Sequence, residues 1–163
     1  MNRKSTGFQT YIAACVISAA TLASCAIAAY AAEQFMVVPT PSDLTWVDTG
    51  PLFPNTQIVI VDGDPGNPGP VTLRFRCPDN YKFFPHTHPG PERVTVLTGT
   101  MLVAIGPNYD ATQLKEVHVG GYFVIPTEAP HYGECRGDTI IEVHTTGPLG
   151  TTYVNASEDP SRR

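Results

Sequence analysis

From residue 57 onward, the chain alternates apolar and polar residues in short runs that turn residues separate. In the run 71–76, Val71, Leu73 and Phe75 alternate with threonine and arginine, which is the period of a strand with one buried face. The preceding run, 57–62, is rich in β-branched residues and ends at a loop of glycine, proline and aspartate. The same reasoning predicts further strands over 81–85, 93–97, 100–105, 116–119, 122–125, 131–135 and 139–144.

This many short strands in about 90 residues predicts an all-β protein whose sheet closes into a barrel, because closure removes exposed strand edges. The 16 prolines and 14 glycines are spread through the chain and leave little room for long helices, so that only one helical turn is expected, at 109–114. A length of 163 residues suits one domain. We divide the chain into a secretory signal segment, 1–31, an N-terminal arm, 32–56, the barrel, 57–155, and a polar tail that we expect to be frayed, 156–163.

The first 31 residues have the pattern of a secretory signal. Arg3 and Lys4 form a positive head, 11–22 is a run of apolar and small residues, and an alanine-rich end predicts cleavage after Ala31. We therefore expect an exported protein, periplasmic or secreted.

Two other interpretations of this segment stay open. The residues 22–25 resemble a bacterial lipobox, in which Cys25 would carry a lipid anchor. The stretch 11–32 is barely long enough to be an uncleaved membrane anchor, since a span needs roughly 20 apolar residues. All three interpretations place the barrel outside the cytoplasm, and no later segment is apolar enough to predict a membrane span in the mature domain.

Export changes the interpretation of the cysteines. Cys15 and Cys25 lie in the signal segment, so the mature domain keeps only Cys77 and Cys135. An even pair in an oxidising compartment is compatible with a disulfide. Two buried free thiols are the alternative, because a buried cysteine also behaves as a small hydrophobe.

The charge of the chain argues against nucleic acid as a partner. The formal net charge is -5, and loss of the signal segment leaves eight basic and fifteen acidic residues without a basic stripe. We expect the partner to be a small-molecule substrate or ligand.

Histidine and glutamate mark the candidate chemistry. His86 and His88 stand two apart at the end of a strand, so both side chains face the same way. Glu92 has the parity of Val94 and of other apolar residues that mark the buried face, and a buried carboxylate needs a compensating cation. His131 lies on another strand, from which it can reach the same interior.

Three imidazoles and one carboxylate predict a site for one divalent transition metal ion. This donor set suits iron, manganese, nickel, cobalt, copper or zinc, whereas magnesium and calcium prefer all-oxygen ligands. With four protein ligands, an octahedral ion keeps open positions, as in reactive rather than structural sites.

These residues resemble the two sequence motifs of the cupin superfamily. His86, His88, Glu92 and Gly99 follow the first motif, G-x5-H-x-H-x3-E-x6-G, with Asn80 in place of its opening glycine. The second motif, G-x5-P-x-G-x2-H-x3-N, matches Gly120, Pro126 and His131, with Glu128 and Cys135 replacing its second glycine and its asparagine. Asparagine tolerates a left-handed turn nearly as well as glycine, so the first departure is mild.

The resemblance implies a cupin double-stranded β-helix, or jelly-roll barrel, with the metal inside on His86, His88, Glu92 and His131, and often a homodimer. It also implies that the strands ending at Cys77 and Cys135 finish at the same end of the barrel, which makes a bridge between them geometrically reasonable. The segment 92–155 is loosely similar to small bacterial cupins, including the cupin domain of the ChrR anti-sigma factor.

Several other polar residues are weaker candidates. His118, between two valines, is expected on the surface. Glu142 and His144 share one face of a strand, and Ile141 and Val143 share the other. Because the two apolar residues are expected on the inward face, Glu142 and His144 are expected to face outward. Pocket-rim positions are conceivable for Tyr81, Tyr122, Tyr132 and Arg93.

The cupin resemblance does not name a reaction, because one fold hosts many functions. We expect a metal-dependent enzyme of the dioxygenase, isomerase or decarboxylase type that acts on a small oxygen-rich organic substrate. Two alternatives remain: a module that binds or senses a small molecule or metal without turnover, and a structural barrel with an idle site.

Overall fold

The computed structural model describes residues 44–163. The predicted signal segment, 1–31, and the first part of the N-terminal arm, 32–43, lie outside the described residues. Within the described part, the fold is all-β, as predicted, and contains no α-helix. No helix of this part is long and apolar enough to cross a membrane.

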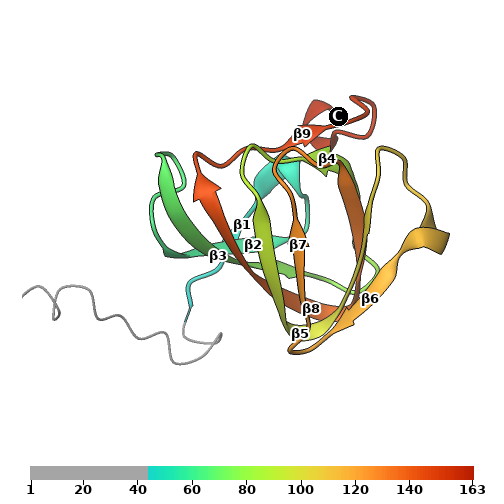
Figure 1. The fold of residues 1–163 in the computed structure, drawn as a ribbon, viewed down its shortest axis with the longest axis horizontal. Coiled ribbons are helices and arrows are strands. Elements are labelled where there is room, and N and C mark those ends of the chain that lie inside the picture. Colours follow the sequence, from blue (N-terminus) through green and yellow to red (C-terminus); the bar gives the residue numbers. More distant parts are fainter. Residues whose placement is uncertain (1–43) are drawn as a thin grey trace, which may run out of the picture. The chain divides into compact units, whose positions relative to one another are not determined.

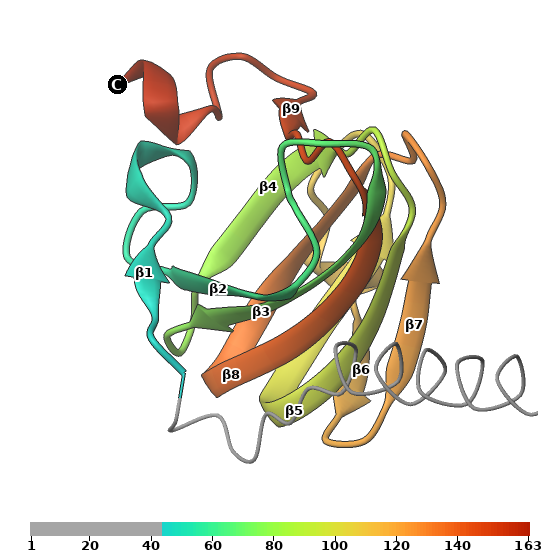
Figure 2. The ribbon, with the colours of Figure 1, turned by 90° about the vertical axis from the view of Figure 1, so that its left-hand side faces the viewer.

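Nine strands form one strongly curled antiparallel sheet, which Figures 1 and 2 show from two directions. The elements in chain order are β1 (Val47–Asp48), η2 (Gly50–Leu52), β2 (Gln57–Asp62), β3 (Gly69–Cys77), β4 (Lys82–Thr87), β5 (Glu92–Ile105), η3 (Ala111–Gln113), β6 (Lys115–His118), β7 (Tyr122–Ile125), β8 (His131–Gly147), β9 (Thr152–Tyr153) and η4 (Pro160–Arg162). The 3-10 turn η3 lies where the helical turn was predicted.

Strand β8 is the central strand of the sheet and pairs with β3, β4 and β5. Its second half pairs with β3 from Gly69↔Gly147 to Cys77↔Thr139, and its first half pairs with β4. On its other side, β8 pairs with β5 along almost its whole length. The short strands β6 and β7 continue the sheet beyond β5, and β2 and β1 continue it beyond β3.

The structure corrects two predicted strand breaks. The separate strands predicted over 93–97 and 100–105 are one strand, β5, and those over 131–135 and 139–144 are one strand, β8. The glycines that predicted turns have positive φ, 67° at Gly99 and 72° at Gly137, and the pairing register shifts beside them. These two irregularities face each other across the β5–β8 ladder, so they bend both strands together instead of reversing the chain.

Alternating residues of the strands fill the interior, as their period predicted. Val94, Val96, Ile141 and Val143 are all buried, and they share the hydrophobic core with Phe75. In β8, nearly all odd-numbered residues from His131 to Gly147 are buried, so one face of the strand points inward along its length.

Cys77 and Cys135 form a disulfide in this core. The two residues are 0% and 1% exposed, and their Cα atoms lie 6.3 Å apart. The bond joins the end of β3 to the first third of β8, at the same end of the barrel, as the cupin resemblance implied. The disulfide is therefore favoured over two free thiols.

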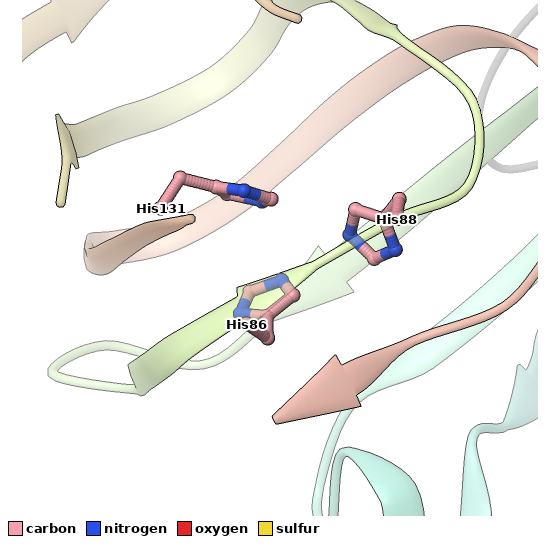
Figure 3. Close-up of side chains that lie close together, drawn as sticks. All are labelled: His86, His88 and His131. Carbon is pink, nitrogen blue, oxygen red and sulfur yellow. The ribbon is translucent and has the colours of Figure 1, made fainter. Parts of the chain in front are cut away.

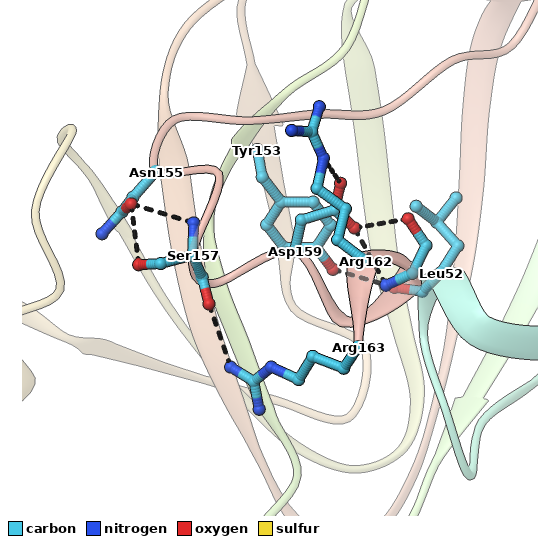
Figure 4. A network of polar contacts seen from close by, with 8 residues as sticks. Leu52, Tyr153, Asn155, Ser157, Asp159, Arg162 and Arg163 are labelled. Carbon is cyan, nitrogen blue, oxygen red and sulfur yellow. Dashed lines mark hydrogen bonds and ion pairs between the residues drawn. The ribbon is translucent and has the colours of Figure 1, made fainter.

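The polar tail is more ordered than expected. Asp159 accepts hydrogen bonds from the Ser161 amide and from Nε of Arg162, at 3.0 and 3.1 Å, and these contacts hold η4 together (Figure 4). Just before the tail, the Tyr153 hydroxyl donates to the Leu52 carbonyl oxygen, at 2.9 Å. Short polar side chains that bond to their own backbone fix this segment without an apolar pattern.

Candidate metal centre

Strands β4 and β8 bring His86 and His131 together. The two residues are direct partners in the antiparallel ladder, and their ring centroids lie 4.3 Å apart. His88 follows immediately after β4, and its ring lies 4.8 Å from that of His86 and 5.2 Å from that of His131. Figure 3 shows the three rings turned toward one another.

A bulge in β4 makes this arrangement compatible with the apolar wall of the site. The register shifts between Phe83 and His86, so that both side chains face the interior although their spacing is odd. Pro85 lies within the bulge, where a residue without an N–H group costs no ladder bond.

Backbone carbonyl groups fix the tautomer of each imidazole. Nδ1 of His86 lies 2.6 Å from the Phe84 carbonyl oxygen, Nδ1 of His88 lies 2.7 Å from that of Gly150, and Nδ1 of His131 lies 3.0 Å from that of Ala129. Because a carbonyl oxygen can only accept, each Nδ1 must carry the proton. In the neutral ring, Nε2 then holds a lone pair, and a second group that orients the ring in this way is typical of metal-binding histidines.

Glu92 is the fourth predicted ligand, and it lies beside two of the histidines. Its carboxylate oxygens lie 3.3 Å from Nε2 of His88 and 3.5 Å from Nε2 of His131. It is the first residue of β5 and pairs with Ile125 of β7, so a third segment of the sheet contributes to the site. The carboxylate side chain is 19% exposed.

Burial keeps two of the imidazoles neutral. Desolvation, aided by the neighbouring histidines, holds the pKa of His86 well below the ordinary value of 6.5. The pKa of His131 is also lowered, chiefly by burial, although the charge of Glu92 opposes the shift. The site therefore presents lone pairs rather than positive charge at neutral pH.

The convergence of these atoms fits a metal ion. The three histidine nitrogen atoms lie within 4.8 Å of one another, so this buried triad could hold a metal. When the rings are neutral, the lone pairs of Nε2 and the carboxylate oxygens of Glu92 repel one another, and a cation among them would remove this repulsion. Nitrogen and carboxylate donors of this kind suit first-row transition metals.

A cavity of about 320 Å³ adjoins the three histidines. Phe53, Phe75 and Phe83 form an aromatic wall on the side of His86, and Phe53 lies edge-on to that ring, with centroids 5.7 Å apart. Phe53 comes from the N-terminal arm, where single apolar residues are separated by proline, aspartate and glycine, and Tyr153, 5.8 Å from His86, comes from the short strand β9. Neither residue was a sequence candidate.

The remaining candidates mostly lie elsewhere. His118 is on the surface, as expected, beside Glu116. His144 and Glu142 face outward, Ile141 and Val143 face the cavity, and Glu142 pairs with Arg74 at 2.9 Å. Of the four rim candidates, Tyr132 lines the cavity, and the other three, Tyr81, Tyr122 and Arg93, do not belong to its described lining.

Two departures from the cupin motifs preserve the required backbone. Asn80 and Glu128, which replace motif glycines, have φ of 62° and 56°, in the same left-handed region as Gly99 and Gly120. The amide of Glu128 donates to the His88 carbonyl oxygen at 3.0 Å, so this turn connects the segments that carry the two motifs. The third departure, Cys135, supplies the disulfide.

Three solved structures with similar folds are distant from this chain in sequence. The polyketide cyclase RemF from Streptomyces resistomycificus has a TM-score of 0.61 at 24% identity, covering 78% of this chain and 92% of its own. A protein proposed to be an acetylacetone dioxygenase, from Methylibium petroleiphilum PM1, has a TM-score of 0.58 at 22% identity, covering 78% and 87%. KdgF from Halomonas sp. has a TM-score of 0.53 at 17% identity, covering 69% and 94%. These similarities confirm the jelly-roll fold.

Sequence comparison gives the family. No curated protein matches the chain significantly. The ChrR cupin-like domain, however, matches residues 34–150, which is most of the chain and includes both motifs. With its fold, its motifs and this match in agreement, the chain belongs to the ChrR cupin-like family of the cupin superfamily.

Proposed function

We propose that this protein is a metal-dependent enzyme that acts on a small, oxygen-containing organic molecule. One divalent transition metal ion would be held by His86, His88, Glu92 and His131. The observation that carries the proposal is the meeting of three oriented imidazoles and a carboxylate beside a cavity large enough for a ligand.

The protein's own residues would prepare this site in two ways. The carbonyl groups of Phe84, Gly150 and Ala129 hold the rings in one orientation, so little reorganisation is needed on binding. The aromatic wall (Phe53, Phe75 and Phe83) excludes water from one side of the cavity, which strengthens electrostatic interactions inside. The bound ion would supply Lewis acidity toward substrate oxygen atoms.

Metal content of purified full-length chain tests the site. We expect one transition metal ion per chain by elemental analysis, and less than a tenth of that content in His86→Ala and His131→Ala variants. The matched control is His118→Ala, which removes an exposed histidine outside the site and should retain the full content. Oxygen-consumption and product assays on the metal-loaded protein, over catechols, diketones and hydroxy acids, then test turnover. Substrate loss that depends on His86 and His131 supports the enzyme.

A binding or sensing module is the second candidate, and the family match to the ChrR cupin-like domain favours it. One structural observation agrees: apart from the four proposed ligands, Tyr132 is the only ionisable residue of the described cavity lining, and its hydroxyl group is engaged with the Asp110 carbonyl oxygen, at 3.2 Å. A sensor would bind a ligand tightly and release it unchanged, whereas the enzyme would convert it. Recovery of unaltered ligand from metal-loaded protein across the whole panel would decide for the sensor.

Export is also proposed. The disulfide between Cys77 and Cys135 supports it, because such bonds persist in oxidising compartments. Mass spectrometry of the mature N-terminus tests it: a chain that begins after Ala31 indicates a released protein, a lipid on Cys25 indicates an anchored one, and an intact Met1 in the native host contradicts cleavage.

A further inference from the structure

The walls of the cavity specify the kind of ligand that the proposed metal centre would accept. No lysine, arginine, aspartate, asparagine or glutamine occurs in its described lining, and the ionisable residues are the four proposed ligands and Tyr132. The other polar side chains are four threonines.

The charge of the site limits the charge of the ligand. A divalent ion with three neutral imidazoles and one carboxylate carries one net positive charge. A singly charged ligand makes the buried assembly neutral, whereas a dianion leaves an unpaired negative charge in an apolar cavity, where no lysine or arginine of the described lining can compensate it. Dicarboxylates are therefore disfavoured.

The aromatic wall limits the shape and polarity of the ligand. Phe53 packs edge-on against Phe75 and Phe83, with centroids 5.5 and 5.9 Å apart. Its backbone is held by the Thr56 hydroxyl, which donates to the Phe53 carbonyl oxygen at 2.6 Å. A wall so fixed suits a flat apolar surface. A polyhydroxylated ligand would bury hydroxyl groups without partners there.

Resting on the proposed function, we infer that the ligand is a singly charged oxygen chelator on a flat, apolar body, of which the enolate of an aryl diketone is the simplest example. The cavity volume of about 320 Å³ sets its size. This volume corresponds to about ten water molecules, so the ligand has on the order of 10–15 non-hydrogen atoms. The two oxygen atoms of the chelating group would face the metal, and the apolar body would contact Phe53.

The test measures binding rather than turnover. Full-length chain is loaded with zinc, which is redox-inert, and its metal content is verified before use. Isothermal titration then compares benzoylacetone, a monoanionic chelator as its enolate, with malonate, a dianion, and glucuronate, a polyhydroxylated monoanion. We expect benzoylacetone to bind at least about tenfold more tightly than either of the other two. Its ultraviolet spectrum in the complex should be that of the enolate, and binding should release about one proton.

Substitutions in the lining should change this order in a directed way. Leu149→Lys places a cation in the cavity and should raise malonate affinity at least about tenfold relative to benzoylacetone. Thr146→Lys, at an exposed position of the lining, tests the same effect if Leu149→Lys does not fold. Phe53→Ala should weaken benzoylacetone and leave malonate unchanged. The control is Tyr122→Lys, an exposed residue of β7 outside the described lining, which should leave the order as it is.

The outcomes separate the two proposals. A chain that does not retain zinc refutes the metal site itself. Zinc-loaded protein that prefers malonate or glucuronate, or that binds none of the three, overturns the inference and leaves the metal site standing. An order unchanged by a lysine in the lining also contradicts it.

Discussion

The disulfide should contribute about 4 kcal/mol to the free energy of unfolding. Cys77 and Cys135 are 58 residues apart, and a cross-link that closes a loop of this length removes about 4 kcal/mol of chain entropy from the unfolded state. Each Cys→Ala change also removes a small buried side chain, at a cost of roughly 1 kcal/mol. Either single substitution should therefore cost about 5 kcal/mol, and the double substitution about 6 kcal/mol.

Urea unfolding of the metal-free protein, followed by circular dichroism, measures these values for the wild type, both single variants and the double variant. Because each single change already breaks the cross-link, the costs should be strongly non-additive. The dependence on urea should steepen in all variants, since the unfolded chain becomes less compact. Two single costs of about 1 kcal/mol that simply add, together with two titratable thiols in the wild type, would refute the bond.

Three further predictions follow from individual contacts. Glu128→Gly should stabilise the protein by roughly 0.5–1 kcal/mol in urea unfolding, because φ is 56° there, and Thr127→Gly, which relieves no positive φ, should destabilise it instead. Glu142→Ala should cost about 2 kcal/mol, since it leaves the 13%-exposed Arg74 side chain without its ion-pair partner, and a double change to Arg74→Met and Glu142→Leu should recover most of the loss; equal costs would contradict the pairing. The metal-free protein should lose stability as the pH falls below 6.5, because the pKa of His86 is lowered in the folded state and the unfolded chain therefore takes up the proton first. The free energy of unfolding should then fall by up to about 1.4 kcal/mol per pH unit from this residue. A His86→Gln variant with the same pH slope would contradict the last assignment.

Much of the fold could be predicted because strand period and turn residues are local signals. The strand over 57–62 has the predicted bounds, and the alternation in 71–76 correctly identified the buried face of β3. The error at Gly99 and Gly137 has a physical cause: a glycine with positive φ serves equally in a turn and in a bulge, and only the partner strand decides between them. Partners distant in sequence leave no local signal.

The site divides in the same way. Strand spacing predicted that His86, His88 and Glu92 face the interior, and His131 was predicted to reach it from another strand. The motif resemblance agreed with all four, and the structure brings them together. Phe53 could not be predicted, because it reaches the cavity from an arm whose position depends on tertiary contacts such as those to Phe75 and Phe83. The carbonyl groups that orient the imidazoles could not be predicted either, because every residue has a carbonyl group and the sequence does not show which one lies beside a ring.

Anomalous diffraction at the absorption edge of the metal, from crystals of purified protein with its native ion, tests the central claim most directly. We predict one anomalous peak per chain, at about 2.1 Å from Nε2 of His86, His88 and His131 and from one carboxylate oxygen of Glu92. Crystals of metal-supplemented protein without a peak between these four side chains, or with the ion bound at other residues, would contradict the account.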